Sequence, residues 1–194
     1  ILAELENADY TVADIKKGER LKKAPVPFTT STLQQEASKA LNFATAKTMR
    51  IAQQLYEGVE IKGSGTIGLI TYLRTDSIRI SEEADALARD YISEQYGAEY
   101  VAEGEARSKK DNKNVQDAHE AIRPTDISRT PAMVKDSLTR DQFRLYQLVW
   151  KRFAASRMQP ARYETTSVKI AAGKYRFTVA ASKVAFEGFR LVYT

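Results

Sequence analysis

The sequence predicts an α+β protein in which a mainly helical domain, helix-turn-helix-like at its start, is inserted into a β-rich module formed by the two chain ends. β-Prone stretches lie near both ends, capped segments with helical periodicity fill the middle, and prolines separate the two kinds of sequence. We place the β-rich module at residues 1–27 and 159–194 and the helical domain at residues 28–158.

The helical domain is predicted to begin with two helices. Residues 10–15 first alternate like a strand, and Pro25 and Pro27 then mark a boundary. A helix is expected at 32–41, because a Thr and a Gln three residues apart form a capping-box pattern at its start, at Thr32 and Gln35. After a short turn, Thr45 is placed to cap a second helix at 46–57.

The next segments alternate between loop, strand and helix. Residues 58–68 are rich in glycine and predict a flexible loop or hairpin. Residues 69–73 are apolar and β-prone, which predicts a short buried strand. Ser81 precedes two glutamates and is typical of a helix start, and Gly97 is typical of a helix end.

The C-terminal half changes from helix to strand. Residues 105–117 are polar and charged and predict a mobile loop. Thr139 and Gln142 predict a capped helix that runs to about Met158. Three β-branched and aromatic runs then predict a meander of strands, at Thr165–Ile170, Tyr175–Ala180 and Phe189–Tyr193.

The composition is compatible with a polyanionic partner. Thirty Lys and Arg against 25 Asp and Glu give a net charge of +5 and a pI near 9.3. No apolar run is long enough to span a membrane, and no signal peptide precedes the first residues. The lack of cysteine excludes disulfides and fits a reducing cytoplasm, and the start at Ile1 without Met suggests a piece of a longer protein.

Tyr72 is the first candidate for chemistry. In an extended segment, Tyr72 and Arg74 project to the same side. A phenol, with a pKa near ~10, becomes a useful nucleophile when its oxyanion is stabilised. A neighbouring guanidinium can favour the phenolate, hold the attacked phosphate, or do both in turn. The structural alternative is a strand-end ion pair in which Arg74 and Asp76 satisfy one another.

His119 is the single histidine of the chain. If its segment is helical, His119 and Arg123 share a face and form a donor pair suited to a phosphate. The alternative is a local ion network with Asp117 and Glu120. One His without Cys does not make a zinc site, and the sequence holds no tight acidic cluster, so we expect no metal site in this chain.

Three sequence blocks resemble motifs of the bacterial type IA DNA topoisomerases. Residues 68–77, GLITYLRTDS, are similar to the nucleophile motif of the family. Residues 27–37, PFTTSTLQQEA, resemble the entry to its helical domain, and residues 118–125, AHEAIRPT, resemble its histidine motif. The blocks occur in the order of the family, and the resemblance covers essentially the whole chain. Leu73 after the tyrosine, in place of Pro, favours the topoisomerase I branch over topoisomerase III.

The resemblance implies a reaction and roles for the site residues. Tyr72 would attack one DNA strand, form a 5′-phosphotyrosyl link and leave a free 3′-hydroxyl. Arg74 would position and neutralise the scissile phosphate, and His119 would contact a nearby backbone phosphate. Thr75 and Asp76 would shape the site. Passage of the second strand through the gap would relax negative supercoils.

The resemblance also implies partners outside these residues. The family binds Mg²⁺ in an N-terminal Toprim domain and has a further domain for single strands, and these 194 residues carry neither. We therefore expect the chain alone to bind no metal and to be unable to cleave or relax DNA. Its expected partners are single-stranded DNA and the missing domains. The parent enzyme is expected to be a monomer in the bacterial cytoplasm, associated with the nucleoid.

Two other interpretations belong to different functional classes. The first is a stand-alone helix-turn-helix module without catalysis, whose second helix offers polar side chains to a major groove, namely Lys47, Arg50, Gln53 and Gln54. The second is a purely structural arch or interaction domain. Salt-dependent binding to single strands, rather than preference for a duplex sequence, would argue against the first.

Overall fold

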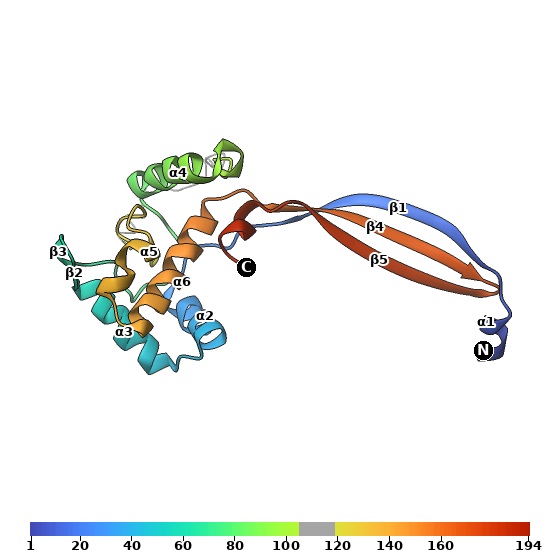
Figure 1. Ribbon diagram of the computed structural model, residues 1–194, viewed down its shortest axis with the longest axis horizontal. Helices are drawn as coiled ribbons and strands as arrows, with labels where there is room; N and C mark the ends of the chain where they lie inside the picture. The colour runs from blue at the N-terminus through green and yellow to red at the C-terminus, as the bar shows by residue number, and fades with distance from the viewer. Residues whose placement is uncertain (105–118) are drawn as a thin grey trace. The chain divides into compact units, whose positions relative to one another are not determined.

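The computed structural model describes residues 1–104 and 119–194, and its chain path is shown in Figure 1. The chain divides into two compact units. The sheet unit comprises residues 1–23 and 160–188, and the helical unit comprises residues 24–159 and 189–194. Helices together with antiparallel sheets confirm the α+β class. The predicted loop at 105–117 lies outside the described residues.

The sheet unit is a three-stranded antiparallel sheet in the order β1-β4-β5. It is preceded by the short helix α1, Leu2–Glu6. Its strands are longer than predicted and span Tyr10–Lys22, Ala161–Ala172 and Tyr175–Phe186. The hairpin between β4 and β5 turns at Gly173, whose φ of 58° lies in the left-handed region that glycine adopts without steric cost.

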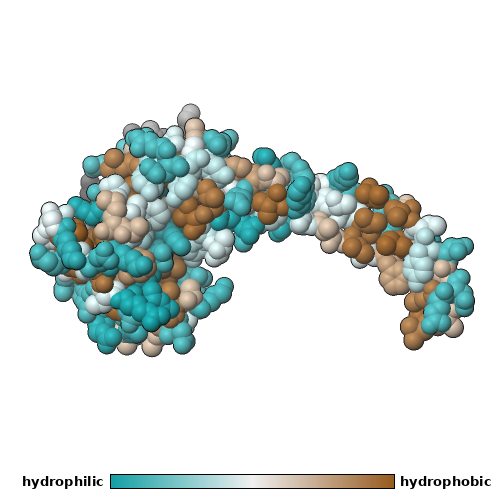
Figure 2. Space-filling model, in the orientation of Figure 1, coloured by the Kyte–Doolittle hydropathy of each residue, from teal (hydrophilic) through white to brown (hydrophobic). Residues whose placement is uncertain are grey.

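One face of this sheet is apolar over the half nearest the β4–β5 turn. The register aligns Val12 with Ile170 and Ile170 with Phe177, and side chains opposite one another share a face. Apolar side chains gather visibly at the surface of these strands in Figure 2. The exposed large ones include Tyr10, Val12, Ile15, Phe177 and Val179. This sheet therefore buries little of its own apolar surface.

The predicted strand at Phe189–Tyr193 is wrong. Gly188–Leu191 forms a 3-10 helix, η3, and residues 189–194 belong to the helical unit rather than to the β-rich module. The Phe189 side chain is buried, and its N–H donates to the Gln159 carbonyl at 2.9 Å. Because this aromatic ring is buried and a tight turn follows it, the segment does not form the β-strand that its composition predicted.

The helical unit is built around α6, Arg140–Ser156, which contacts α2, α3 and α5. Besides η3, the other elements are helices and one small hairpin: α2 (Thr30–Leu41), α3 (Thr45–Glu57), β2 (Val59–Ile61), β3 (Gly65–Ile67), α4 (Glu82–Tyr96), η1 (Ala98–Tyr100), α5 (Pro131–Val134) and η2 (Lys135–Ser137). Its core includes Phe28, Leu33, Leu55, Tyr146 and Phe153. In the described part of the chain, no helix combines the length and apolarity that a membrane crossing needs.

The helix caps were predicted correctly at two starts and wrongly at two others. Ser81 caps α4 and Thr139 caps α6 with its capping box, as expected. The cap of α2 is Thr29, and Thr32 stands at the third helical position, so the predicted start was late. Helix α3 begins after Ala44, which offers no side-chain cap. The predicted hairpin in 58–68 is confirmed by β2 and β3.

Candidate active site

Tyr72 lies in an irregular segment between the buried residues Ile70 and Leu73, and the chain bends at Leu73. Its side chain is 46% exposed, whereas Ile70 and Leu73 are both 1% exposed. The predicted burial is confirmed for Leu69, Ile70 and Leu73 but not for Tyr72, and the predicted strand is reduced to an isolated bridge between Ile70 and Pro124. Arg74 is also exposed, so the two polar groups flank the buried Leu73. Burial of the apolar neighbours leaves the phenol accessible.

The end of α3 fixes the start of this segment. The Leu69 N–H donates to the Leu55 carbonyl at 2.8 Å. A Cβ added at Gly68 would lie 2.8 Å from the Tyr56 carbonyl oxygen, closer than side chains tolerate. Glycine is therefore required at position 68 by the close approach of the backbone of α3.

The histidine motif runs alongside the tyrosine motif. The Thr71 N–H donates to the Arg123 carbonyl at 2.9 Å, and the Thr71 hydroxyl donates to the Ala121 carbonyl at 2.7 Å. The Thr125 N–H donates in return to the Leu69 carbonyl at 3.0 Å. His119, at the start of this stretch, is exposed. The residues that follow His119 are thus paired to the backbone that carries Tyr72.

The entry motif, residues 27–37, contacts the chain on the other side of Tyr72. The Thr30 hydroxyl donates to the Leu73 carbonyl at 2.7 Å and accepts from the Thr75 N–H at 2.8 Å. The Ile122 N–H donates to the Phe28 carbonyl at 2.8 Å. Three blocks that are far apart in the sequence therefore meet at the segment that carries Tyr72. Thr30 was not predicted as part of the site, because its role depends on a contact across more than 40 residues.

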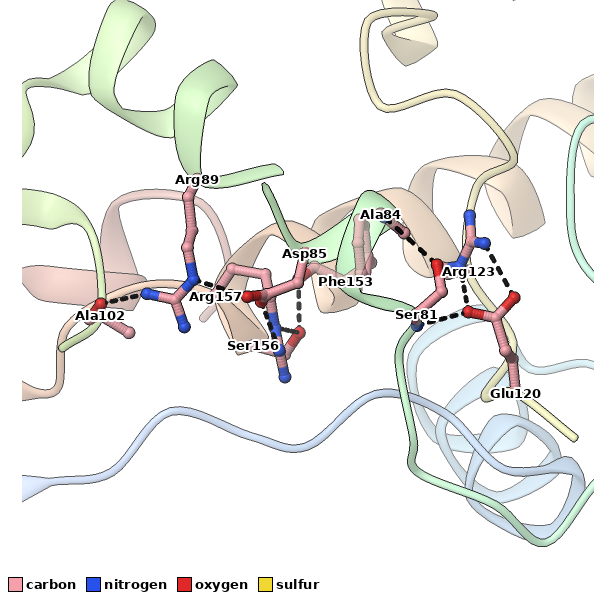
Figure 3. Close-up of polar contacts among 10 residues, drawn as sticks. All are labelled: Ser81, Ala84, Asp85, Arg89, Ala102, Glu120, Arg123, Phe153, Ser156 and Arg157. Carbon is pink, nitrogen blue, oxygen red and sulfur yellow. Dashed lines mark hydrogen bonds and ion pairs between the residues drawn. The ribbon is translucent and has the colours of Figure 1, made fainter. Parts of the chain in front are cut away.

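Arg123 is held by its own neighbours rather than paired on a helix with His119. Residues 119–123 are not helical, so the geometry required for a shared helical face is missing. The Arg123 guanidinium bonds Glu120 at 2.8 Å, and Glu120 accepts the Ser81 N–H at 2.6 Å (Figure 3). A local ion network thus forms, as the alternative interpretation expected, although Asp117 lies outside the described residues.

The electrostatics of Glu120 follow from these contacts. Partial burial raises the pKa of its carboxyl, but the hydrogen bonds from Arg123 and from the Ser81 backbone favour the charged form more strongly. The pKa of Glu120 is therefore lowered, and the carboxylate keeps Arg123 engaged. This network connects the start of α4 to the segment that runs beside Tyr72.

Arg74, Thr75 and Asp76 form the exposed continuation of the tyrosine motif. Arg74 and Asp76, both within the described residues, make no ion pair with each other, so the predicted strand-end pair is not formed. The Thr75 hydroxyl accepts the Ser77 N–H at 3.1 Å, a local contact that fixes the backbone after the site. The guanidinium of Arg74 is accessible on the same segment as the phenol.

A second ion network, which the sequence did not indicate, lies farther along α4. Asp85 accepts bonds of 2.8 Å from both Arg89 and Arg157, and Arg89 also donates to the Ala102 carbonyl (Figure 3). These groups line a surface pocket of about 780 Å³. Burial raises the pKa of Asp85, but the two guanidinium groups outweigh burial and lower it. This network ties α4 to the end of α6.

Metal-ligand geometry and the helix-turn-helix interpretation can both be compared with the described residues. Among these residues, no group of three or more His, Cys, Asp or Glu side chains is arranged to hold a metal ion.

On α3, several predicted base-reading side chains have partners within the chain. Lys47 pairs with Asp141 at 2.8 Å, and Gln54 accepts from Gln142 at 3.0 Å. Arg50 is exposed.

Comparison with known proteins identifies the family. A family model described as DNA topoisomerase matches residues 1–194. The chain also superimposes on the structure of full-length topoisomerase I from Thermotoga maritima with a TM-score of 0.86 and 44% sequence identity. The match covers 100% of this chain and 31% of that chain, so the chain spans about a third of its solved relative. Residues 1–194 therefore belong to the type IA DNA topoisomerase family.

Proposed function

We propose that residues 1–194 supply the nucleophile of a longer type IA topoisomerase, and that Tyr72 attacks the backbone of one DNA strand. The Tyr72 oxygen forms a bond to phosphorus while the bond from phosphorus to the 3′ oxygen breaks. The phenol loses its proton and the departing 3′ oxygen gains one, so the protons balance. Resealing is the reverse reaction, and strand passage between the two steps would relax negative supercoils.

The observation that supports this proposal is the convergence of three motifs on Tyr72. Backbone hydrogen bonds join the tyrosine segment to the entry motif through Thr30 and to the histidine motif through Thr71. Rigid positioning of a nucleophile is worth a large part of the barrier in reactions of this kind. The fold thus anchors the backbone on both sides of one exposed phenol.

Each neighbouring residue has a proposed role. Exposed Arg74 would contact the scissile phosphate, because a guanidinium can bind two phosphate oxygens and neutralise their charge. His119 would contact an adjacent backbone phosphate. Thr75 and Asp76 would shape the chain after the nucleophile. Arg123 would act indirectly, by holding Glu120 and the start of α4 beside the site.

Mg²⁺ is proposed to act from outside this chain. Asp76 is the one carboxylate of the tyrosine motif, and among the described residues no group of three or more His, Cys, Asp or Glu side chains is arranged to hold a metal ion. The residues described here therefore do not match such a site, and no step assigned to them uses the metal. An acidic Toprim domain elsewhere in the polypeptide would supply it.

The test of the nucleophile uses the complete enzyme that contains these residues. Incubation with a labelled single-stranded oligonucleotide and Mg²⁺, followed by denaturation, should yield a covalent protein–DNA adduct. Tyr72→Phe should abolish the adduct, because the ring remains but the attacking oxygen is lost. Tyr96→Phe, which removes a hydroxyl from another tyrosine of the helical unit, should leave the yield unchanged. An adduct of normal yield from Tyr72→Phe would refute the assignment.

The same assay tests whether the chain is sufficient. Residues 1–194 alone should form no adduct and should not relax a negatively supercoiled plasmid. An adduct formed by the isolated chain would show that the metal-binding domain is dispensable and would contradict this part of the proposal.

A further inference from the structure

The ring of Tyr72 rests against a second tyrosine, Tyr56, near the end of α3. The ring centroids are 5.3 Å apart and the ring planes are inclined at 61°, an edge-to-face arrangement. Tyr56 is 40% exposed and Tyr72 is 46% exposed. An apolar pattern on α3 would place Tyr56 in the core, but the structure places it beside the proposed nucleophile.

Backbone contacts make this pairing a consequence of the fold. Leu69 is bonded to Leu55, one residue before Tyr56, and Gly68 packs directly on the Tyr56 carbonyl. The end of α3 and the segment that carries Tyr72 are therefore held in contact without help from the two rings. The rings meet because their backbones are already adjacent.

The backbone anchors do not fix the ring of Tyr72. They act on Thr71 and Leu73, the residues before and after it, whereas the Tyr72 ring projects from the segment and has staggered rotamers available. An edge-to-face contact with Tyr56 favours the rotamers that keep the two rings together. The contact with Tyr56 therefore bears on the orientation of the phenol and on the direction of its oxygen.

We propose that Tyr56 is a positioning residue that holds the Tyr72 ring in the orientation needed for attack on phosphorus. The proposal rests on the function assigned to Tyr72 above. Tyr56 acts through its ring and takes no part in the proton or phosphoryl transfer. A phenylalanine at position 56 should therefore serve as well as tyrosine.

The test compares ring-removing and ring-keeping variants in the complete enzyme. Single-turnover cleavage of a labelled single-stranded oligonucleotide is measured for Tyr56→Ala, Tyr56→Leu and Tyr56→Phe. We expect Ala and Leu to slow cleavage by about tenfold, the loss that corresponds to one aromatic pair, and Phe to restore the rate. Tyr96→Ala, which disrupts the separate Tyr96–Tyr100 ring pair, is the matched control and should leave the rate unchanged.

Oligonucleotide affinity is measured separately, with each Tyr56 variant combined with Tyr72→Phe so that no cleavage occurs. Unchanged affinity is expected, because the proposed role is orientation rather than contact with DNA. Normal cleavage by Tyr56→Ala, an equal rate loss in Tyr56→Phe, or a loss explained by weaker binding would each overturn the proposal. If Tyr72→Phe alone still forms the adduct, the assignment of the nucleophile fails instead, so the two failures are distinguishable.

Discussion

Tyr72 combines an accessible side chain with a fixed backbone. Its neighbours on both sides carry the anchoring hydrogen bonds, through the hydroxyls of Thr71 and Thr30. Each of these hydroxyls donates to a main-chain carbonyl of a distant segment, so it fixes the backbone beside Tyr72 without covering the phenol. The glycine at position 68 also holds this segment in place, because the backbone of α3 comes too close there for a side chain.

Gly68→Ala should separate the tyrosine segment from α3. The added methyl would lie 2.8 Å from the Tyr56 carbonyl oxygen, so the backbone must shift. We expect a loss of about 1–3 kcal/mol in the free energy of unfolding, measured by denaturant titration. Gly104→Ala is the control, because nothing lies within 4 Å of the added methyl, and it should be nearly neutral. Equal stability of the two variants would contradict the close-approach argument.

The sequence singled out the residues proposed to react, but it did not indicate the residues that support them. Tyr72 and Arg74 stand out because a phenol and a guanidinium alternate with apolar residues, a local pattern that the exposures match. Thr30, Glu120 and Tyr56 act through partners tens of residues away or on another element. No local pattern distinguishes such a residue from an ordinary helix start, surface acid or core aromatic.

Side chains cap the starts of α2, α4 and α6, whereas α1, α5 and α3 start without such a cap, and α3 is the longest of these three. Its N-cap Ala44 has φ −64° and ψ 152°, the extended conformation that a capping serine adopts. The sequence predicted Thr45 as the cap, because threonine is a favoured N-cap residue. Packing of buried Ile51, Ala52 and Leu55 sets the register of α3 instead.

Ala44→Ser should stabilise the helical unit. The new hydroxyl can accept from the free N–H groups of the first turn, which adds about 0.5–1 kcal/mol to the free energy of unfolding. Ala86→Ser makes the same chemical change at an exposed position inside α4, where serine has a lower helix propensity than alanine, and should be slightly destabilising. Thermal unfolding of the pair measures the difference. A gain from Ala86→Ser equal to that from Ala44→Ser would contradict the cap geometry.

The junction of α4 with α6 should be sensitive to acid. Asp85 bonds Arg157 across the two helices with a side chain that is 29% exposed, and Asp85→Asn should cost about 1–2 kcal/mol near neutral pH. Because the folded pKa of Asp85 is lowered, its contribution is present above the unfolded value near 3.8 and is lost as the pH falls through the folded value.

Denaturant titrations at several pH values test this prediction. The stability difference between the wild type and Asp85→Asn should be constant near neutral pH and shrink in the acid range. Asp90→Asn, an exposed change on the same helix, should show little difference at any pH. A difference between wild type and Asp85→Asn that grows on acidification would show that the sign of the pKa change is wrong.

Considered as a whole, the chain contains one unit with a substantial core and one without. The helical unit buries large side chains such as Tyr146 and Phe153, whereas the buried hydrophobic residues of the described sheet unit are Ala161 and Ala172. A three-stranded sheet with little buried area is only marginally stable by itself. Prolines and periodicity predicted a division of the chain, but they did not reveal the missing core, because β5 carries as many apolar residues as an ordinary buried strand.

This asymmetry predicts uneven protection from hydrogen exchange in the isolated 194-residue chain. Amides of β1 and β5 should exchange through local opening at a lower free energy than amides of α6, whose apolar face is buried. Exchange followed by peptide mass spectrometry gives the comparison. Equal protection of the sheet and of α6 would mean that the sheet is stabilised by more than the contacts described here.

Peptide mapping of the trapped covalent complex tests the account most directly. The complete enzyme is reacted with a single-stranded oligonucleotide, denatured and digested, and the peptide that bears the nucleotide is sequenced by mass spectrometry. The proposed mechanism predicts that the nucleotide is esterified through its 5′ phosphate to the Tyr72 oxygen, in the peptide that contains residues 68–77. Attachment to any other side chain would contradict it.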